Sequence, residues 1–156
     1  MFYKKSGYSL LETLIYMALI GVMLAISSSA IISTYRTFNL LRVDRKISIN
    51  GDAVLEMIIR DTRSSATATT NQGSNTLTIG AITYAVSGSQ MTRQDGVSAA
   101  QAITGTDVRV TSLNFYKDTS PNSDIISVRM TIESGQGQYV KSKQYYGSAV
   151  LRGSYK

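Results

Sequence analysis

One carboxylate stands at the start of a long uncharged stretch, and its position suggests chemistry more strongly than any other residue. Two lysines, Lys4 and Lys5, precede Gly7, and Glu12 follows five residues later. No charged residue then occurs before Arg36. A carboxylate inside a membrane helix costs on the order of 2.5–3.5 kcal/mol at the bilayer centre and less near the interface. We therefore expect Glu12 to need a positive partner.

A newly formed chain end could supply that partner. Cleavage after Gly7 would free an α-amino group on Tyr8, and Glu12 lies one helical turn further along the chain. The carboxylate could meet the amine of its own chain or that of a neighbouring chain. A pair formed away from water would fix the axial register of packed helices, because an unpaired buried charge is costly. The alternative is that Glu12 lies at headgroup level and interacts only with the helix dipole.

The stretch after Glu12 is apolar on all sides. Its large side chains are Leu14, Ile15, Met17, Leu19, Ile20, Val22, Met23, Leu24, Ile26, Ile31 and Ile32. About 20 such residues suffice to cross the hydrocarbon layer as a helix, and a soluble helix would normally show a stripe instead. Three interpretations stay open: a cleaved secretory signal with AISSSA as its cleavage site, a permanent membrane anchor, or a helix that later leaves the membrane for a protein assembly.

Taken together, KKSG followed by YSLLETLIYMALIGVMLAI resembles the class III signal of type IV pilins and pseudopilins. That family has a short basic leader ending in glycine, then an aromatic or apolar residue, and an acidic residue at the fifth mature position. These positions correspond to Gly7, Tyr8 and Glu12. Gly21 stands where many pilins carry a helix-loosening glycine, whereas Ser29 replaces the proline that often follows.

The resemblance implies a processing route and a set of partners. Prepilin peptidase would cut after Gly7 at the cytoplasmic face and methylate the amine of Tyr8, with Lys4 and Lys5 in the leader. The precursor would span the inner membrane once, and the mature chain would join other pilin or pseudopilin subunits in an extracytoplasmic filament, with Glu12 setting the register. Counting lysines and arginines alone favours the opposite orientation, since four follow the span; the leader motif overrides that count.

Beyond the apolar run, the pattern predicts that the helix continues as an amphipathic stem over residues 36–63. Its apolar stripe has helical spacing and comprises Leu40, Val43, Ile47, Val54, Leu55, Ile58 and Ile59. We expect a bend or local weakening at Asn50-Gly51, because glycine inside a helix costs about 1 kcal/mol relative to alanine. Asp52 could cap a restarted helix there.

Residues 64–156 alternate between apolar and polar side chains in short runs, which predicts an antiparallel sheet with one face on the stem. Turns are expected at Gly80-Ala81 and Ser87-Gly88, a bulge at Ser112-Leu113, and a break in the last strand at Gly147. The clearest strand is IISVRMTIES, and the last is QYVKSKQYYGSAVLRG. Three segments are expected to be loops: SSATATTNQGSN, QDGVSAAQAITGTD and KDTSPNSD.

This second half resembles minor pilins and J-type minor pseudopilins, through IIRDTRSSA, VTSLNFY and the long alternating hairpin. The resemblance implies a pilin-like α+β fold with a leader (1–7), a transmembrane and assembly helix (8–35), a helical stem (36–63) and a sheet head domain (64–156). It further implies a minor subunit of a type IV pilus, a type II secretion system or a competence pseudopilus. The absence of cysteine excludes the disulfide-closed head of many major pilins.

Catalytic and metal chemistry find little support in the composition. The chain has no histidine and no cysteine, which removes Ser/His/Asp and Cys/His sets and the commonest metal ligands. Lys141 and Lys143 flank a serine, but adjacent strand residues face opposite ways. Asp118 and Asp124 match no calcium-binding pattern. We expect neither an enzyme nor a cofactor.

Basic and aromatic residues mix near the C-terminus: Tyr139, Lys141, Lys143, Tyr145, Tyr146, Arg152, Tyr155 and Lys156. Proteins that bind single-stranded nucleic acid use this mixture, although exposed strands favour the same residue types. An alternative function is therefore a DNA-binding or adhesive module on a pilin-type anchor. Its nucleic-acid contacts would be Lys141, Lys143, Tyr145, Tyr146 and Arg152. A further alternative is a single-pass membrane protein that never polymerises.

Overall fold

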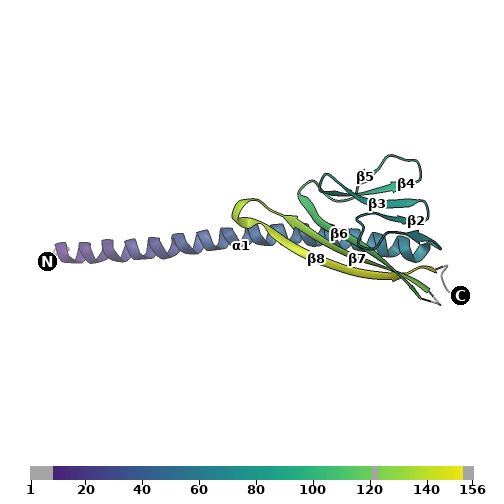
Figure 1. Cartoon of the computed structure of the whole chain (residues 1–156). Coiled ribbons are helices and arrows are strands. Elements are labelled where there is room, and N and C mark those ends of the chain that lie inside the picture. Colours follow the sequence, from purple (N-terminus) through teal and green to yellow (C-terminus); the bar gives the residue numbers. More distant parts are fainter. Residues whose placement is uncertain (1–8, 121–122, 153–156) are drawn as a thin grey trace, which may run out of the picture. The chain divides into compact units, whose positions relative to one another are not determined.

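The computed structural model describes residues 9–120 and 123–152, and it divides the chain into two compact units, residues 1–39 and 40–156. The single long helix, α1 (Leu10–Ser64), begins in the first unit and ends in the second. All strands lie in the second unit (Figure 1). The expected α+β, pilin-like class is confirmed, and the described helix ends one residue beyond the expected Arg63.

In the first unit, α1 exposes its apolar side chains on every side. Leu10, Met17 and Met23 are each at least 70% exposed. Leu14, Ile20 and Leu24 are 55–62% exposed. Four hydroxyl groups of this segment are turned back onto the helix. Thr13, Ser29, Thr34 and Thr37 each donate to a backbone carbonyl three or four residues earlier, at 2.9–3.0 Å.

The second unit contains two antiparallel sheets where the sequence predicted one. Five strands in chain order form the first sheet: β1 (Ala68–Thr69), β2 (Leu77–Ile79), β3 (Ile82–Ser87), β4 (Gln90–Asp95) and β5 (Gln101–Ala102). The second sheet has the order β6 (Val108–Ser120), β7 (Ser123–Ser134) and β8 (Lys141–Val150), with the short 3-10 helix η1 (Gly137–Tyr139) before β8. β7 and β8 run beside the part of α1 that belongs to this unit (Figure 1).

The three expected loops are wrong in part, because polar segments pair through their backbones. The first contains β1 and a bridge between Ser74 and Phe115, and the second contains β5. Most of the third is strand, since β6 pairs with β7 as far as Ser120 and Ser123. The second predicted turn lies one residue later, at Gly88 and Ser89, both with positive φ.

The long strands β6 and β7 follow the predicted pattern of side chains. The register of β6 shifts between Val110 and Ser112, so the bulge lies one residue before the expected Ser112-Leu113. This bulge keeps four residues on one buried face: Val108, Val110, Leu113 and Phe115. On β7 the buried apolar side chains are the four predicted ones, Ile126, Val128, Met130 and Ile132. These strands pack with Ile47, Val54 and Ile58 of α1 in one core.

The expected weakening at Asn50-Gly51 is wrong, because α1 runs through it without interruption. Gly51 is buried, and a Cβ atom there would lie 2.2 Å from Cζ of Tyr145. The Tyr145 hydroxyl donates to the carbonyl of Ile47 at 3.0 Å. β8 is likewise unbroken at Gly147, where a Cβ atom would lie 2.6 Å from Leu55. Both glycines therefore let the helix and the last strand approach closely.

A buried polar cluster fastens the end of α1 to the five-stranded sheet. Asp61 is only 8% exposed and Tyr84 is fully buried. The Tyr84 hydroxyl donates to Oδ2 of Asp61 at 2.6 Å, and Nε of Arg93 donates to the same oxygen at 3.3 Å. Burial, and then the hydrogen bond with Asp61, raise the pKa of the Tyr84 phenol well above its ordinary value, although Arg93 acts in the opposite direction.

This raised pKa predicts a loss of stability in alkali. Below pH 10.0, the ordinary pKa of tyrosine, the phenol is protonated in both states and its contribution is fully present. As the pH rises beyond that value the unfolded state releases its proton first. The free energy of unfolding should then fall by up to about 1.4 kcal/mol per pH unit from this group.

Urea unfolding of the wild type and Tyr84→Phe at about pH 9 and about pH 11 measures the effect. The wild type should lose about 1–1.4 kcal/mol more than Tyr84→Phe over that interval. Tyr146→Phe, which alters an exposed ring, should leave the wild-type slope unchanged. Equal slopes for the wild type and Tyr84→Phe would contradict the assignment.

Candidate functional site

The candidate site begins at the first turn of α1. Gly7, Tyr8, Lys4 and Lys5 lie outside the described residues. Glu12 is the acidic residue of the first helical turn. Its backbone N–H donates to the carbonyl of Ser9 at 2.9 Å.

The carboxylate of Glu12 accepts a hydrogen bond from a tyrosine one helical turn further along the chain. The hydroxyl of Tyr16 donates to Oε1 of Glu12 at 3.4 Å, a contact that the i, i+4 spacing of a helix permits. Among residues 9–120 and 123–152, no lysine or arginine lies within ion-pair distance of Glu12. A positive partner for this carboxylate must therefore come from outside the described part of the chain.

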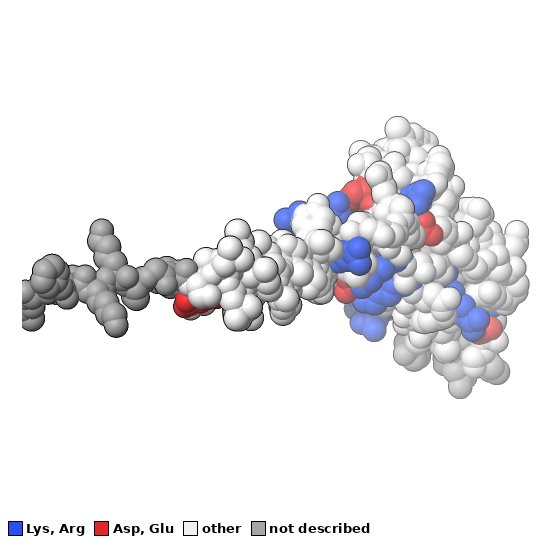
Figure 2. Space-filling model, turned by 90° about the vertical axis from the view of Figure 1, so that its left-hand side faces the viewer, with Lys and Arg blue, Asp and Glu red and all other residues white. Residues whose placement is uncertain are grey.

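The surface that follows Glu12 carries no charge until Arg36. In the space-filling view, this stretch is white beyond one acidic spot near the undescribed N-terminus (Figure 2). α1 is long and apolar enough to cross a membrane, and no residue of its most apolar window is buried within the chain. These side chains need a lipid or protein environment, since apolar surface on this scale is rarely left in water.

The basic and aromatic residues near the C-terminus do not form one surface. Tyr145 is buried against α1, and Lys143 lies over its ring and donates to Oγ of Ser48 at 3.1 Å. Lys141 also turns toward α1, with Nζ 3.9 Å from Asp44. Tyr146 projects from the opposite face of β8, because neighbouring strand residues alternate.

The remaining candidates near the end of the chain are dispersed as well. Arg152 is exposed and its backbone N–H donates to the carbonyl of Ser65 at 3.2 Å. Asp124 pairs with Lys117 at 2.9 Å, and Asp118 is exposed on β6. Tyr155 and Lys156 fall outside the described residues. Within the described ranges, no group of three or more acidic side chains is arranged to hold a metal ion.

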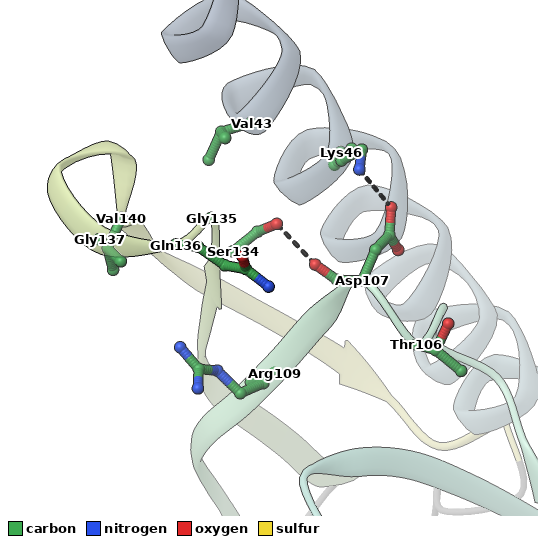
Figure 3. Close-up of a pocket in the computed structure, with 10 residues that line it drawn as sticks. All are labelled: Val43, Lys46, Thr106, Asp107, Arg109, Ser134, Gly135, Gln136, Gly137 and Val140. Carbon is green, nitrogen blue, oxygen red and sulfur yellow. Dashed lines mark hydrogen bonds and ion pairs between the residues drawn. The ribbon is translucent and has the colours of Figure 1, made fainter.

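A groove of about 580 Å³ lies between α1, the start of β6 and the turn that joins β7 to β8 (Figure 3). Its charged side chains are already paired. Lys46 meets Asp107 at 3.1 Å, and Arg109 meets Glu133 at 2.6 Å. The Ser134 hydroxyl donates to the carbonyl of Asp107. These contacts join α1 to the segment before β6, and β6 to β7. Among the residues that line the groove, no nucleophile has a neighbouring base.

The family comparison points to the N-terminal segment. Residues 3–28 match the model described as the prokaryotic N-terminal methylation motif. Neither the curated proteins nor the solved structures contain a match to the chain. The match covers the residues around Glu12 and the first part of the apolar helix, which precedes a pilin-like α+β arrangement. The chain therefore carries the N-terminal methylation motif of type IV pilin-like precursors, followed by a pilin-like α+β fold.

Proposed function

We propose that the chain is a minor subunit of a type IV filament, either a pilus or a secretion or competence pseudopilus. Residues 1–7 are the leader, 8–35 the membrane and assembly helix, 36–63 the stem and 64–156 the head. The precursor spans the inner membrane once. After processing, it enters an extracytoplasmic filament at the periplasmic side or the cell surface.

One observation carries this proposal: a methylation motif leads into an uncharged helix that has a single carboxylate at its start. The exposed apolar side chains of that helix can exchange lipid contacts for contacts with other helices. Its carboxylate has no basic partner within the described residues, and the amine created by cleavage has the required charge.

In this mechanism, prepilin peptidase cuts between Gly7 and Tyr8 and methylates the new amine. Glu12 of one subunit then pairs with the Tyr8 amine of a neighbour in the helical core. The pair is strong only where water is excluded, so it stabilises the axial register in which the two groups meet relative to other registers. The head domain determines which subunits lie alongside it. The minor role rests on the likeness of the second half of the chain to minor pilins and pseudopilins.

Intact-mass measurement of the protein isolated from its native cells tests the processing step. We expect a chain that starts at Tyr8 and carries one methyl group on its amine. A parallel sample from cells lacking the prepilin peptidase should retain Met1 to Gly7. If the native protein keeps Met1 in cells with active peptidase, the chain is a permanent membrane anchor and the proposal fails.

A further inference from the structure

The outward face of the three-stranded sheet carries a cation between two aromatic rings. Arg129 lies on the central strand β7, Tyr116 on β6 and Tyr146 on β8 (Figure 1). The guanidinium carbon of Arg129 is 5.3 Å from the centre of the Tyr116 ring and 6.0 Å from that of Tyr146. This face points away from α1, since the alternate residues of β7 form the buried core.

The Arg129 guanidinium has no acidic partner among the residues that the structure describes. Other arginines of the sheets are paired: Arg109 with Glu133, and Arg93 with Asp61 and Asp95. The two rings hold the guanidinium by cation–π contact. Its planar fork of N–H donors therefore remains available for a carboxylate from outside the chain.

Two shallow hollows flank the pair formed by Arg129 and Tyr146. Their volumes are about 190 Å³ and about 330 Å³, and both residues line both hollows. The first is lined on its exposed side by hydroxyl and amide groups of Ser112, Asn114, Tyr116, Thr131 and Gln144. The second adds Ser127 and Ser148.

No acidic side chain lines either hollow. Their apolar lining residues, Val128 and Met130, are each only 2% exposed. Tyr146, by contrast, is 60% exposed, and its hydroxyl donates to Oε1 of Gln144. The accessible groups are thus aromatic faces, hydroxyls, amides and one cation.

This set of groups suits a sugar chain better than other ligands. Aromatic faces pack against the C–H face of a sugar ring, and hydroxyls and amides match sugar hydroxyls as both donors and acceptors. A nucleic acid would need several cations along its phosphates. Lys141 and Lys143, the nearest candidates in sequence, turn to the opposite face and bind α1 side chains.

We propose that this face binds an acidic saccharide, a chain containing hexuronate residues, with the carboxylate on Arg129 and neighbouring sugar rings in the two hollows. The proposal goes beyond the filament function and does not depend on it. Tyr146 supplies a surface on which a sugar ring can stack, and Tyr116 holds the Arg129 guanidinium by cation–π contact. Gln144 and Thr131 supply hydrogen-bonding groups to the sugar hydroxyls.

Isothermal titration of the full chain in detergent micelles tests this assignment. The probes are a hyaluronate hexasaccharide, the neutral cellohexaose and a deoxythymidine oligonucleotide. We expect hyaluronate to bind at least about tenfold more tightly than cellohexaose, because the carboxylate adds a charge-assisted hydrogen bond. Arg129→Gln should remove that preference, and Tyr146→Ala should weaken both saccharides.

Lys143→Gln is the matched control, because it removes the same charge from the opposite face of the same sheet. It should leave saccharide binding unchanged. Equal losses in Lys143→Gln and Arg129→Gln would overturn the assignment and indicate a net-charge effect. Binding of the oligonucleotide through Arg129 without hyaluronate binding would replace the ligand class, and no binding of any probe would refute the site. Circular dichroism of each variant confirms that the fold is retained.

Discussion

Glu12→Ala is expected to leave membrane insertion and leader cleavage intact but to reduce incorporation into filaments at least tenfold. The substitution removes one partner of the proposed pair and leaves the Tyr8 amine of the neighbouring subunit without its counter-charge. Removing one member of a buried ion pair typically costs about 3–5 kcal/mol. Sheared-filament fractions, compared with the membrane fraction by immunoblot, measure the partition directly.

The neighbouring variants separate charge from shape. Glu12→Gln keeps the size of the side chain and its contact with Tyr16 but loses the charge, so it should assemble as poorly as Glu12→Ala. Glu12→Asp keeps the charge and should recover part of the incorporation. Tyr16→Phe loses only the 3.4 Å hydrogen bond and should still assemble. If Glu12→Gln assembles as well as the wild type, charge pairing has no role in assembly.

Gly51→Ala is expected to destabilise the second unit by about 1–3 kcal/mol, although alanine is the better helix former. The new Cβ would lie 2.2–2.6 Å from three ring atoms of Tyr145. That ring is only 5% exposed, so it has little room to move. Overpacking costs about 1–3 kcal/mol. Losing the hydrogen bond from Tyr145 to Ile47 adds about 1 kcal/mol, and the gain in helix propensity offsets about 1 kcal/mol.

Asp52→Ala provides the control for Gly51→Ala at the adjacent, exposed position of the same helix. It should change the free energy of unfolding by less than about 0.5 kcal/mol. Tyr145→Leu combined with Gly51→Ala should cost less than the sum of the two single variants, because the clash is absent. Urea unfolding followed by circular dichroism gives these values. A stabilised Gly51→Ala would show that Tyr145 does not press on the helix.

The parts of the fold that could be predicted are those that depend on the spacing of apolar side chains along the chain. The stripe of Ile47, Val54 and Ile58 predicted the packed face of α1, and its burial confirms this. The alternation on β7 and the bulge before Leu113 followed from the need to keep apolar residues on one face.

Contacts between segments that are distant in sequence could not be predicted. The sequence suggested a weak point in the helix at Gly51, because the low helix propensity of glycine is known from the residue type alone. The reason why a glycine is needed there is the close approach of the Tyr145 ring, and Tyr145 lies 94 positions later in the chain. The strands β1 and β5 are short and polar, and only their pairing with neighbours defines them. The cluster of Asp61, Tyr84 and Arg93 is likewise assembled from three separate elements.

For the candidate site, almost all the predicted residue roles come from one local sequence motif. The roles of Gly7, Tyr8 and Glu12 are positional, so adjacent residues suffice to suggest them, and they stay predictions. Tyr16 was missed, although its i, i+4 spacing from Glu12 could have indicated the contact. The outward face with Arg129 was also missed, because its residues come from three strands whose register is set only in the folded sheet.

The hydroxyl groups of the first unit have a consequence for how this helix can change surroundings. Because Thr13, Ser29, Thr34 and Thr37 already satisfy themselves on their own backbone, none of them must find or abandon an external partner when neighbours are replaced. Transfer of the helix from lipid into an apolar protein environment would then leave these four hydrogen bonds unchanged. Between Ser9 and Tyr35, Glu12 is the only charged residue, so the electrostatic effect of such a change of surroundings falls on the end of the helix that carries it.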